Sequence, residues 1–357
     1  MPQLLGGIET TTFDLCVQLG RMGHETAVMC ELGRHDRVWL ANRIMSRLTH
    51  RAFPPGRFQG TRVYRGYGPQ TALAEVIGDF RPDDLVVPGG SDGAFTLAQR
   101  CAATGVSTVF YFHELVSVRR LSDFSALEGI PLIANSAYTA REVRALLGRD
   151  SAIVPPLVNA AAYRTPTTRR HVTMVNPRKM KGGQIALEMA QACPDIPFVF
   201  VEAWHTHNEF VAGLHAAARA LPNVTWHAPT PDMLSIYAGT RVLLVPSQWE
   251  ETWGRVVTEA QASGIPALAS NYGALPESVG PGGVLIARDA PVAEWVRALR
   301  RLWDDQALYE SLSKRCLEYA ARPEVQPAQA AATFLAALRQ SVRQTFQGQS
   351  PRASMRS

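Results

Sequence analysis

Short β-rich runs alternate with helical patterns along most of the chain, and this alternation limits the fold more than any other feature. Strands that alternate with helices are typical of parallel sheets covered by helices. We therefore expect a first series of strands at residues 26–30, 84–88, 107–112, 131–135 and 151–154. A second series is expected at residues 171–175, 197–202, 223–227, 241–246 and 265–269.

A polar stretch, YRTPTTRR at residues 163–170, separates the two series of strands. With 357 residues and 46% apolar content, the chain is long enough to bury two cores of ordinary size. We expect two doubly wound α/β domains facing a shared cleft, because such sheets bind ligands at the carboxyl ends of their strands. The expected division is a first domain at 1–164, a second at 165–325, a helix at 326–345 that crosses back to the first domain, and a disordered tail at 346–357.

The start of the chain departs from this pattern. In a doubly wound sheet the first glycine-rich turn follows the first strand, yet only Met1–Leu5 precede Gly6 and Gly7. The first strand would lie in the middle of the sheet, where it pairs with a neighbour on each side. We expect this strand to be missing, and our hypothesis is a misassigned start or a truncated gene product.

Arginines are concentrated near the N-terminus, although the formal net charge is only +5. Almost no acidic residue opposes Arg34, Arg37, Arg43, Arg47, Arg51, Arg57, Arg62 and Arg65. This asymmetry indicates an anionic partner. Residues 37–53 have the pattern of a basic amphipathic helix, which either packs its apolar stripe on the first domain or docks on anionic lipid or a phosphate-bearing acceptor. The stretch lacks interleaved aromatics, so we expect no nucleic-acid partner.

Several function classes lack their sequence signatures. No apolar run approaches the roughly 20 residues of a membrane-spanning helix, and no secretory signal is recognisable, so we expect a cytoplasmic protein, peripheral at the inner membrane face if the basic helix docks there. The chain has no GxxxxGK[ST], GxSxG or HExxH motif. His205, His207 and Glu209 imitate metal-ligand spacing, but the scattered cysteines form no CxxC pair, and we expect no bound metal.

The segment PSQWEETWGRVVTEAQASGIP at residues 246–266 carries the sharpest constellation of polar groups. Glu251 lies in a loop after a strand, and Glu259 lies eight positions later within a helix, at most ~12 Å away at helical rise. The helix N-terminus between them offers free N–H groups to an anion. The connecting loop contributes Thr252, Trp253 and Gly254. Taken alone, both glutamates could equally be solvated acids, with Glu259 paired to Arg255.

With this segment, the chain resembles the retaining glycosyltransferases of family 4, whose GT-B fold consists of two facing Rossmann-like domains. The glutamate pair followed by Gly-Ile-Pro is the most specific mark, and GALPESVG at 273–280 continues it. Further matches are GGIE at 6–9, GHE at 23–25, FHE at 112–114 and ANSAYTAREV at 134–143. The resemblance implies transfer from a UDP-, GDP- or dTDP-linked sugar to an acceptor glycan, lipid-linked sugar or small molecule, without a bound metal or cofactor.

The resemblance also implies roles for individual residues of the second domain. Glu251 contacts the transferred sugar, Glu259 contacts the ribose hydroxyls, and Lys181, within VNPRKMKGG at 175–183, contacts the diphosphate. A cation at this place stabilises the charge that develops on the leaving group. The usual arginine stands five positions before the lysine, where this chain has Asn176, so Arg178 either takes that role from a shifted loop or belongs, with its basic neighbours, to a solvated loop.

In the first domain the resemblance makes the loop of Gly6 and Gly7 face the donor, where a helix N-terminus offers free N–H groups. His113 becomes a sugar-contacting residue, and Asn135 and Ser136 occupy the end of the next strand. The family has no demonstrated protein nucleophile, so we assign positioning and charge stabilisation to these residues. Two alternatives stay open: a nucleotide-sugar epimerase, and a catalytically silent protein that binds nucleotide sugars.

Overall fold

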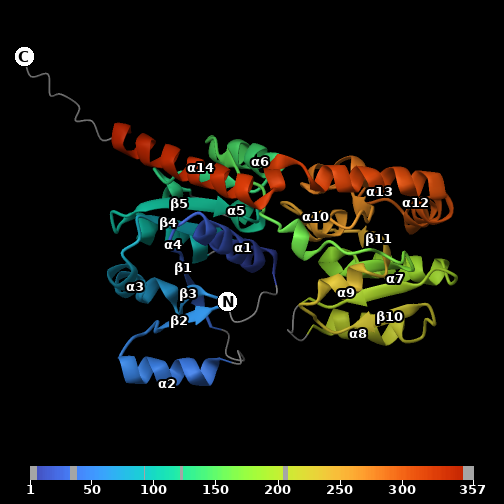
Figure 1. Ribbon diagram of the computed structural model, residues 1–357, viewed down its shortest axis with the longest axis horizontal. Helices are drawn as coiled ribbons and strands as arrows, with labels where there is room; N and C mark the ends of the chain where they lie inside the picture. The colour runs from blue at the N-terminus through green and yellow to red at the C-terminus, as the bar shows by residue number, and fades with distance from the viewer. Residues whose placement is uncertain (1–5, 33–37, 92, 121–123, 204–207, 349–357) are drawn as a thin grey trace, which may run out of the picture.

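The computed structural model describes residues 6–32, 38–91, 93–120, 124–203 and 208–348, and Figure 1 shows them as two α/β domains side by side. Each of the ten strands expected from the sequence coincides with an observed strand. The second domain has one six-stranded sheet, all parallel, in the order β10-β9-β8-β11-β12-β13. Its strands are β8 (His171–Val175), β9 (Phe198–Val201), β10 (Val224–His227), β11 (Thr240–Val245), β12 (Ala267–Ser270) and β13 (Gly283–Ile286).

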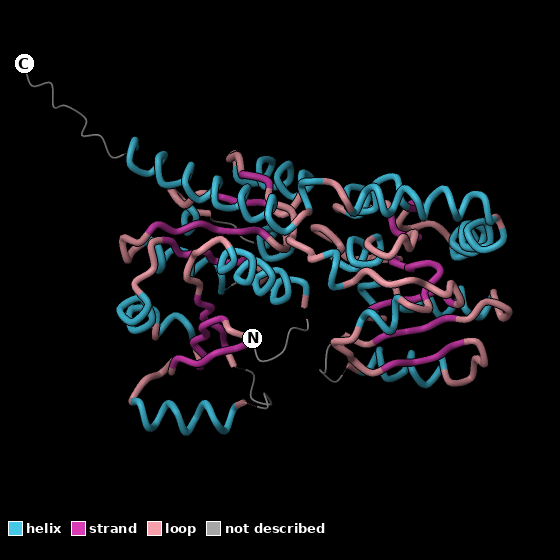
Figure 2. The backbone as a smooth tube through the Cα atoms, viewed as in Figure 1, coloured by secondary structure: helices cyan, strands magenta, loops and turns pink. Residues whose placement is uncertain are grey.

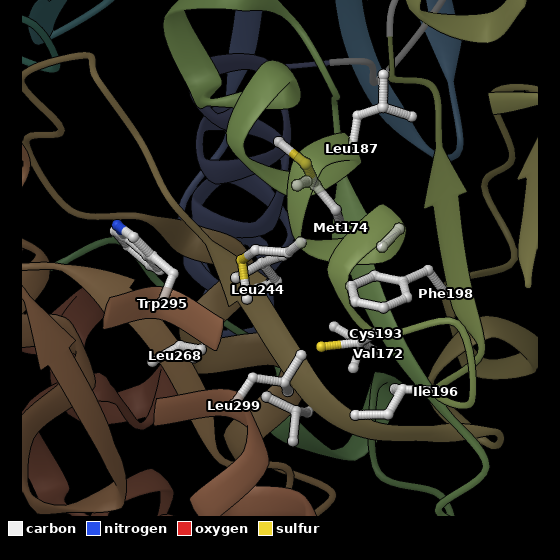
Figure 3. Close-up of a cluster of buried hydrophobic side chains, with 14 of the residues drawn as sticks. Val172, Met174, Leu187, Cys193, Ile196, Phe198, Leu244, Leu268, Trp295 and Leu299 are labelled. Carbon is white, nitrogen blue, oxygen red and sulfur yellow. The ribbon is translucent and has the colours of Figure 1, made fainter. Parts of the chain in front are cut away.

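Helices cover both faces of this sheet. They are α7 (Gly183–Ala192), α8 (Glu209–Ala218), α9 (Met233–Tyr237), α10 (Arg255–Gln261), α11 (Leu275–Val279), α12 (Val292–Asp304) and α13 (Gln306–Ala320). Figure 3 shows the larger core, where Phe198 of β9 and Leu244 of β11 meet Trp295 and Leu299 of α12. A second cluster joins β11 and β12 to α10 and α11 on the other face. Because both faces are covered, the strands are nearly continuous apolar runs, as parallel sheets require.

The first domain contains two sheets. A three-stranded sheet has the order β1-β3-β2, and a four-stranded parallel sheet has the order β4-β5-β6-β7. Their bounds are β1 (Ala27–Glu31), β2 (Pro55–Phe58), β3 (Thr61–Gly66), β4 (Asp84–Gly89), β5 (Ser107–Phe112), β6 (Leu132–Ala134) and β7 (Ala152–Ile153). The helices are α1 (Gly7–Arg21), α2 (Trp39–Thr49), α3 (Leu73–Phe80), α4 (Gly93–Ala102), α5 (Val116–Arg120) and α6 (Ala137–Leu147).

The division between these two sheets falls at the place of the first strand, which the sequence analysis expected to be missing. In the second domain β8 lies between β9 and β11, the strands that follow its first and third helical connections. The corresponding places in the first domain are held by β1 and β4, and among the described residues no strand pairs with both of them. Residues 1–5, which precede the glycine pair, lie outside the described residues.

The C-terminal helix α14 (Pro327–Gly348) packs on the first domain, and Figure 2 shows it running back across the top of that domain. Phe334 and Ala331 of α14 join Leu19 of α1 and Val109 of β5 in one core cluster. The tail expected at 346–357 lies largely outside the described residues, beyond Gly348. Among the helices that are described, none combines the length and apolar character needed to cross a bilayer.

The sequence left two interpretations of residues 37–53 open. The one in which the basic helix packs its apolar stripe on the first domain is wrong. The helix is observed at Trp39–Thr49, and none of its residues is buried. Leu40, Ile44 and Leu48 point outward and are largely exposed. Its contacts to the domain are made instead by polar side chains, such as Asn42, which donates a hydrogen bond to the carbonyl of Arg65.

Candidate active site

The carboxyl ends of β8 and β11 bring Lys181 and Glu251 together. Lys181 ends a 3₁₀ turn (Lys179–Lys181) between β8 and α7, and its Nζ lies 2.6 Å from Oε1 of Glu251. The same carboxylate oxygen accepts a hydrogen bond of 2.9 Å from the hydroxyl of Ser247, just beyond β11. Both side chains of the ion pair are partly exposed. The sequence placed these two residues in one site, and the structure brings them into contact.

Two glycines permit this close approach. Gly182 has φ +81°, and a Cβ there would lie 2.0 Å from the carbonyl oxygen of Pro246. Gly273 has φ +63°, and a Cβ would lie 2.4 Å from the carbonyl oxygen of Glu251. Any larger residue would therefore clash with fixed backbone as well as adopt a strained conformation. A backbone hydrogen bond of 2.9 Å from Gln248 to the carbonyl of Met180 also ties the two loops together.

Glu259 is buried within α10, only 6% exposed, rather than solvated. Its Oε1 accepts a hydrogen bond of 2.9 Å from Nε of Arg255, and its Oε2 accepts one of 3.1 Å from the hydroxyl of Tyr237. The pairing with Arg255 is thus confirmed, and the solvated interpretation of Glu259 is wrong. A ribose that hydrogen bonds to Glu259 would have to share or replace these two partners.

Arg255 links the two domains. Besides Glu259, it contacts Asp14 and Thr11 of α1 and donates a hydrogen bond of 2.7 Å to the carbonyl of Leu157. Burial disfavours the charged guanidinium, but the nearby carboxylates of Glu259 and Asp14 outweigh it and raise the pKa of Arg255. Burial raises the pKa of Asp14, against the opposing effect of the arginine. The sequence offered Arg255 only as a partner for Glu259, since it could not show that α10 packs against α1.

The carboxyl ends of β5 and β6 meet the loop that follows β11. The hydroxyl of Thr252 donates a hydrogen bond of 2.7 Å to the carbonyl of His113 and accepts one of 2.9 Å from Nδ2 of Asn135. Asn135 is buried, and its Oδ1 also accepts a hydrogen bond from Thr139. Ser136 directly precedes α6 and caps it, because its hydroxyl accepts a hydrogen bond from the backbone N–H of Thr139. These expected site residues therefore meet at the contact between the domains.

The imidazole of His113 is half-buried and lies against the ring of Tyr111, with ring centroids 4.1 Å apart. Burial lowers the pKa of His113 to about 4. The ring is therefore neutral near pH 7 and offers one donor and one acceptor rather than a positive charge.

Two further interdomain contacts were missed by sequence reasoning. Glu250 is buried, accepts hydrogen bonds of 3.0 Å and 2.7 Å from Arg119, and accepts one of 2.6 Å from the hydroxyl of Tyr138. Although burial opposes ionisation, the hydrogen bonds from Arg119 and Tyr138 lower the pKa of Glu250. Glu277 accepts hydrogen bonds from the backbone N–H groups of Ala137 and Tyr138 at the start of α6. Glu277 lies within the GALPESVG motif, and this motif was the one feature of the sequence that could have identified it as a site residue.

The remaining expected residues lie around this core of contacts. Gly6 caps α1 and Gly7 begins it. Ile8 of the same turn reaches the loop after β4, where a Cβ on Gly90 would lie 2.5 Å from its Cδ1. Arg178 precedes the 3₁₀ turn of Lys181 and is half-buried. Trp253 is buried, and its Nε1 donates a hydrogen bond to the hydroxyl of Thr258; Gly254, with φ +86°, directly precedes α10.

The structure does not test the metal-like triplet of the sequence. His205 and His207 lie outside the described residues, and Glu209 begins α8. Within the part of the chain that is described, no group of three His, Cys, Asp or Glu side chains is arranged to hold a metal ion.

Two family models match the chain, one over each domain. "Glycosyltransferase Family 4" matches residues 5–162, and "Glycosyl transferases group 1" matches residues 168–321. Curated relatives include the D-inositol 3-phosphate glycosyltransferase of Paenarthrobacter aurescens, 26% identical over 53% of this chain and 52% of that protein. The enzyme of the same name from Corynebacterium kroppenstedtii is 35% identical over 28% of this chain and 23% of its own length. The chain therefore spans between a quarter and about half of these relatives.

Solved structures match over nearly the whole chain. Sucrose-phosphate synthase from Thermosynechococcus elongatus has a TM-score of 0.75 at 16% identity, covering 96% of this chain and 94% of that one. Anabaena HepE in complex with UDP has a TM-score of 0.72 at 15% identity, covering 94% and 96%. At such identities the likeness shows the fold, two facing parallel-sheet domains of the GT-B type, and the expected fold class is confirmed.

Proposed function

Because this chain belongs to glycosyltransferase family 4, the group 1 glycosyltransferases, we propose that it transfers a sugar from a nucleotide-sugar donor to an acceptor with retention of configuration. The observation that carries the proposal is the ion pair of Lys181 and Glu251 at the carboxyl ends of β8 and β11. Strand carboxyl ends are where such sheets bind nucleotides. A partly exposed lysine held at this edge by one carboxylate is available to an incoming anion.

In the proposed complex, the donor diphosphate replaces Glu251 as the partner of Lys181. Lys181 is directly followed by Gly182 and by α7, whose first N–H groups have no partner within the helix and favour an anion. Release from the lysine frees the Glu251 carboxylate to accept hydrogen bonds from hydroxyls of the transferred sugar. The ribose then lies toward Glu259, which exchanges its contact with Tyr237 or Arg255 for the sugar hydroxyls.

The proposed reaction breaks the bond between the sugar C1 and the diphosphate oxygen and forms a bond between C1 and the acceptor oxygen on the same face. The acceptor proton goes to the departing phosphate, so no protein base is required. Lys181 stabilises the negative charge that develops on the leaving group. Neutral His113 positions the sugar by hydrogen bonding, and the interdomain contacts of Thr252 hold that histidine against the second domain.

The acceptor belongs to the first domain in this proposal and is a glycan, a lipid-linked sugar or a small molecule. Arginines cluster in that domain, so an anionic acceptor fits its charge. The curated relatives are named for D-inositol 3-phosphate, a phosphorylated polyol. We therefore include this compound among the acceptors to be tested.

Substituting Lys181 by alanine tests the proposal. We expect the melting temperature of the wild-type protein to rise with one of UDP, GDP, dTDP or ADP, because a ligand of the folded state stabilises it. In Lys181→Ala this shift should disappear, and release of nucleoside diphosphate from the matching sugar donor should fall by roughly 10²–10³-fold. The measurements are thermal unfolding with each nucleotide and a coupled assay of diphosphate release.

Lys179→Ala is the matched control, because Lys179 lies in the same turn and is exposed. It should keep both the shift and the turnover. A folded wild-type protein that binds none of the nucleotides would contradict the proposal. Binding with no turnover for any acceptor would favour the catalytically silent alternative, and turnover without acceptor would favour the epimerase.

A further inference from the structure

The helix α2 turns its row of apolar side chains toward solvent instead of toward its own domain. Leu40, Ile44 and Leu48 are 61%, 50% and 72% exposed, and their spacing of four residues places them in one row along the helix. A surface helix normally turns such a row toward the core of its own domain. Figure 1 shows α2 at the outer edge of the first domain, with no other element on its outer side.

The side of α2 that faces the domain carries the polar residues Asn42 and Ser46 beside the half-buried Trp39. Nδ2 of Asn42 donates a hydrogen bond of 3.1 Å to the carbonyl of Arg65, and Ser46 donates one of 2.8 Å to the carbonyl of Arg51. These residues lie on the opposite side of the helix from the apolar row, since each turn contains 3.6 residues. The apolar row therefore contributes nothing to holding the helix on its domain.

Basic residues flank the apolar row, and Arg51, just beyond the end of α2, is paired with Asp79 of α3. No Asp or Glu occurs at residues 37–74. Arg43 and Arg47 are exposed and lie along one flank of the row, with the guanidinium of Arg43 5.2 Å from the ring centroid of Trp39. An exposed apolar row flanked by arginines matches the interface of an anionic bilayer, where hydrocarbon lies beneath negative headgroups.

We propose that α2 docks this protein on an anionic lipid surface, with Leu40, Ile44 and Leu48 entering the interface and Arg43 and Arg47 at the level of the headgroups. A second copy of the chain is a poorer occupant, because a symmetric contact would bring the same arginines together. Nucleic acid is also poorer, since an apolar row gains nothing from phosphates. The proposal is independent of the proposed sugar transfer, because α2 contains none of the site residues.

Co-sedimentation with vesicles tests the docking. The full chain is mixed with vesicles of phosphatidylcholine alone and with an equimolar mixture of phosphatidylcholine and phosphatidylglycerol. We expect binding to the anionic vesicles only, and weaker binding as salt is added. Arg43→Glu with Arg47→Glu should weaken it by at least about 25-fold, from a factor of about five for each arginine near such a surface. Leu40→Ser with Leu48→Ser should abolish it.

Matched controls come from the second domain. Arg297 and Arg301 of α12 are also exposed and four residues apart, so Arg297→Glu with Arg301→Glu makes the same charge change elsewhere. Leu317→Ser in α13 removes one exposed leucine away from α2. Both controls should sediment like the wild type. Thermal unfolding and nucleotide binding should stay unchanged in all variants, since the substituted side chains are exposed.

Three outcomes would overturn the proposal. One is a wild-type protein that does not bind anionic vesicles. Another is an equal loss of vesicle binding in the Arg297→Glu with Arg301→Glu control, which would indicate general charge attraction. The third is a dimer that Leu40→Ser with Leu48→Ser converts to a monomer in light scattering, which would make the row a contact between copies. Because the Leu48→Ser variant alone changes the most exposed of the three residues, it repeats the test if the double variant fails to fold.

Discussion

The two domains repeat one architecture, but their sheets differ at the centre. In the second domain β8 pairs with β9 and β11, and every residue of β9 is buried. In the first domain β1 and β4 hold the corresponding places without a strand that pairs with both among the described residues, and no residue of β1 is buried. A central parallel strand therefore contributes more than its own hydrogen bonds, because the strands on either side depend on it for burial as well as for pairing.

Contacts with the second domain and with α14 compensate for the divided sheet. α14 closes one face of the four-stranded sheet, and Arg255, Glu250 and Glu277 reach from the second domain to α1, α5 and α6. The comparison therefore suggests that the first domain depends on the second for stability more than the second depends on the first. Three predictions examine this difference.

The largest effect is expected from Arg255→Ala, which removes the link between α10 and α1. It leaves the carboxylates of Glu259 and Asp14 without their buried partner, which typically costs about 3–5 kcal/mol. We expect hydrogen exchange in α1 and β1 to accelerate much more than exchange in β8 and β9. Hydrogen exchange with mass spectrometry reports both regions in one experiment.

Arg300→Ala is the control for this substitution, because Arg300 pairs with Asp195 on the surface of the second domain. Its loss should cost less than about 1 kcal/mol. If Arg255→Ala instead accelerated exchange equally in both domains, they would unfold as one unit and the inferred dependence would be wrong.

A smaller effect is expected from a pair of identical substitutions in the two sheets. Met174 of β8 is 1% exposed, whereas Met29 of β1 is only half-buried. Met174→Ala should cost about 2–5 kcal/mol of local stability through the cavity that it leaves. Met29→Ala should cost about 1 kcal/mol, because less apolar surface is lost from the core.

The measurement for this pair is the urea dependence of exchange in each sheet, because a single unfolding free energy is poorly defined for two domains. Equal losses for the two methionines would mean that β1 is as well packed in solution as β8. The contrast between the two sheets would then fail.

The sequence predicted the alternation of strands and helices well, and what it missed has physical reasons. The sequence did not predict β2 and β3, because arginines, prolines and glycines interrupt the apolar pattern of this hairpin, in which β2 is the edge strand and β3 pairs with β1. β13, another edge strand, follows directly on glycines and was also missed. The strands that were found carry apolar runs with few interruptions, such as residues 107–112 and 241–246.

The contact of Lys181 with Glu251 follows from two loops at the same edge of a parallel sheet, which sequence order can predict. The interdomain contacts could not be predicted this way. Arg255, Glu250 and Glu277 act across the domain interface, and their partners lie more than a hundred residues away in the chain. Burial of Glu259 was missed because one of its partners, Tyr237, comes from α9, a different helix of the same domain.

The smallest expected effect is the pH dependence of the first domain caused by His113. Burial lowers its folded pKa to about 4, below the ordinary value near 6.5. The unfolded chain therefore binds more protons between these values, so stability is complete above about pH 6.5 and declines as the pH falls toward 4. Because the ring is only half-buried, we expect a loss of roughly 1–2 kcal/mol across this window.

His113→Gln should remove this acid sensitivity from the first domain and leave the second domain unchanged. Burial also lowers the pKa of His171, at the start of β8, so His171→Gln is the matched variant for the second domain. Exchange measured at pH 7 and pH 5 reads each sheet separately. If His113→Gln kept the full acid response in β5, the sensitivity would belong to other groups, and the neutral histidine proposed to position the sugar would lose its support.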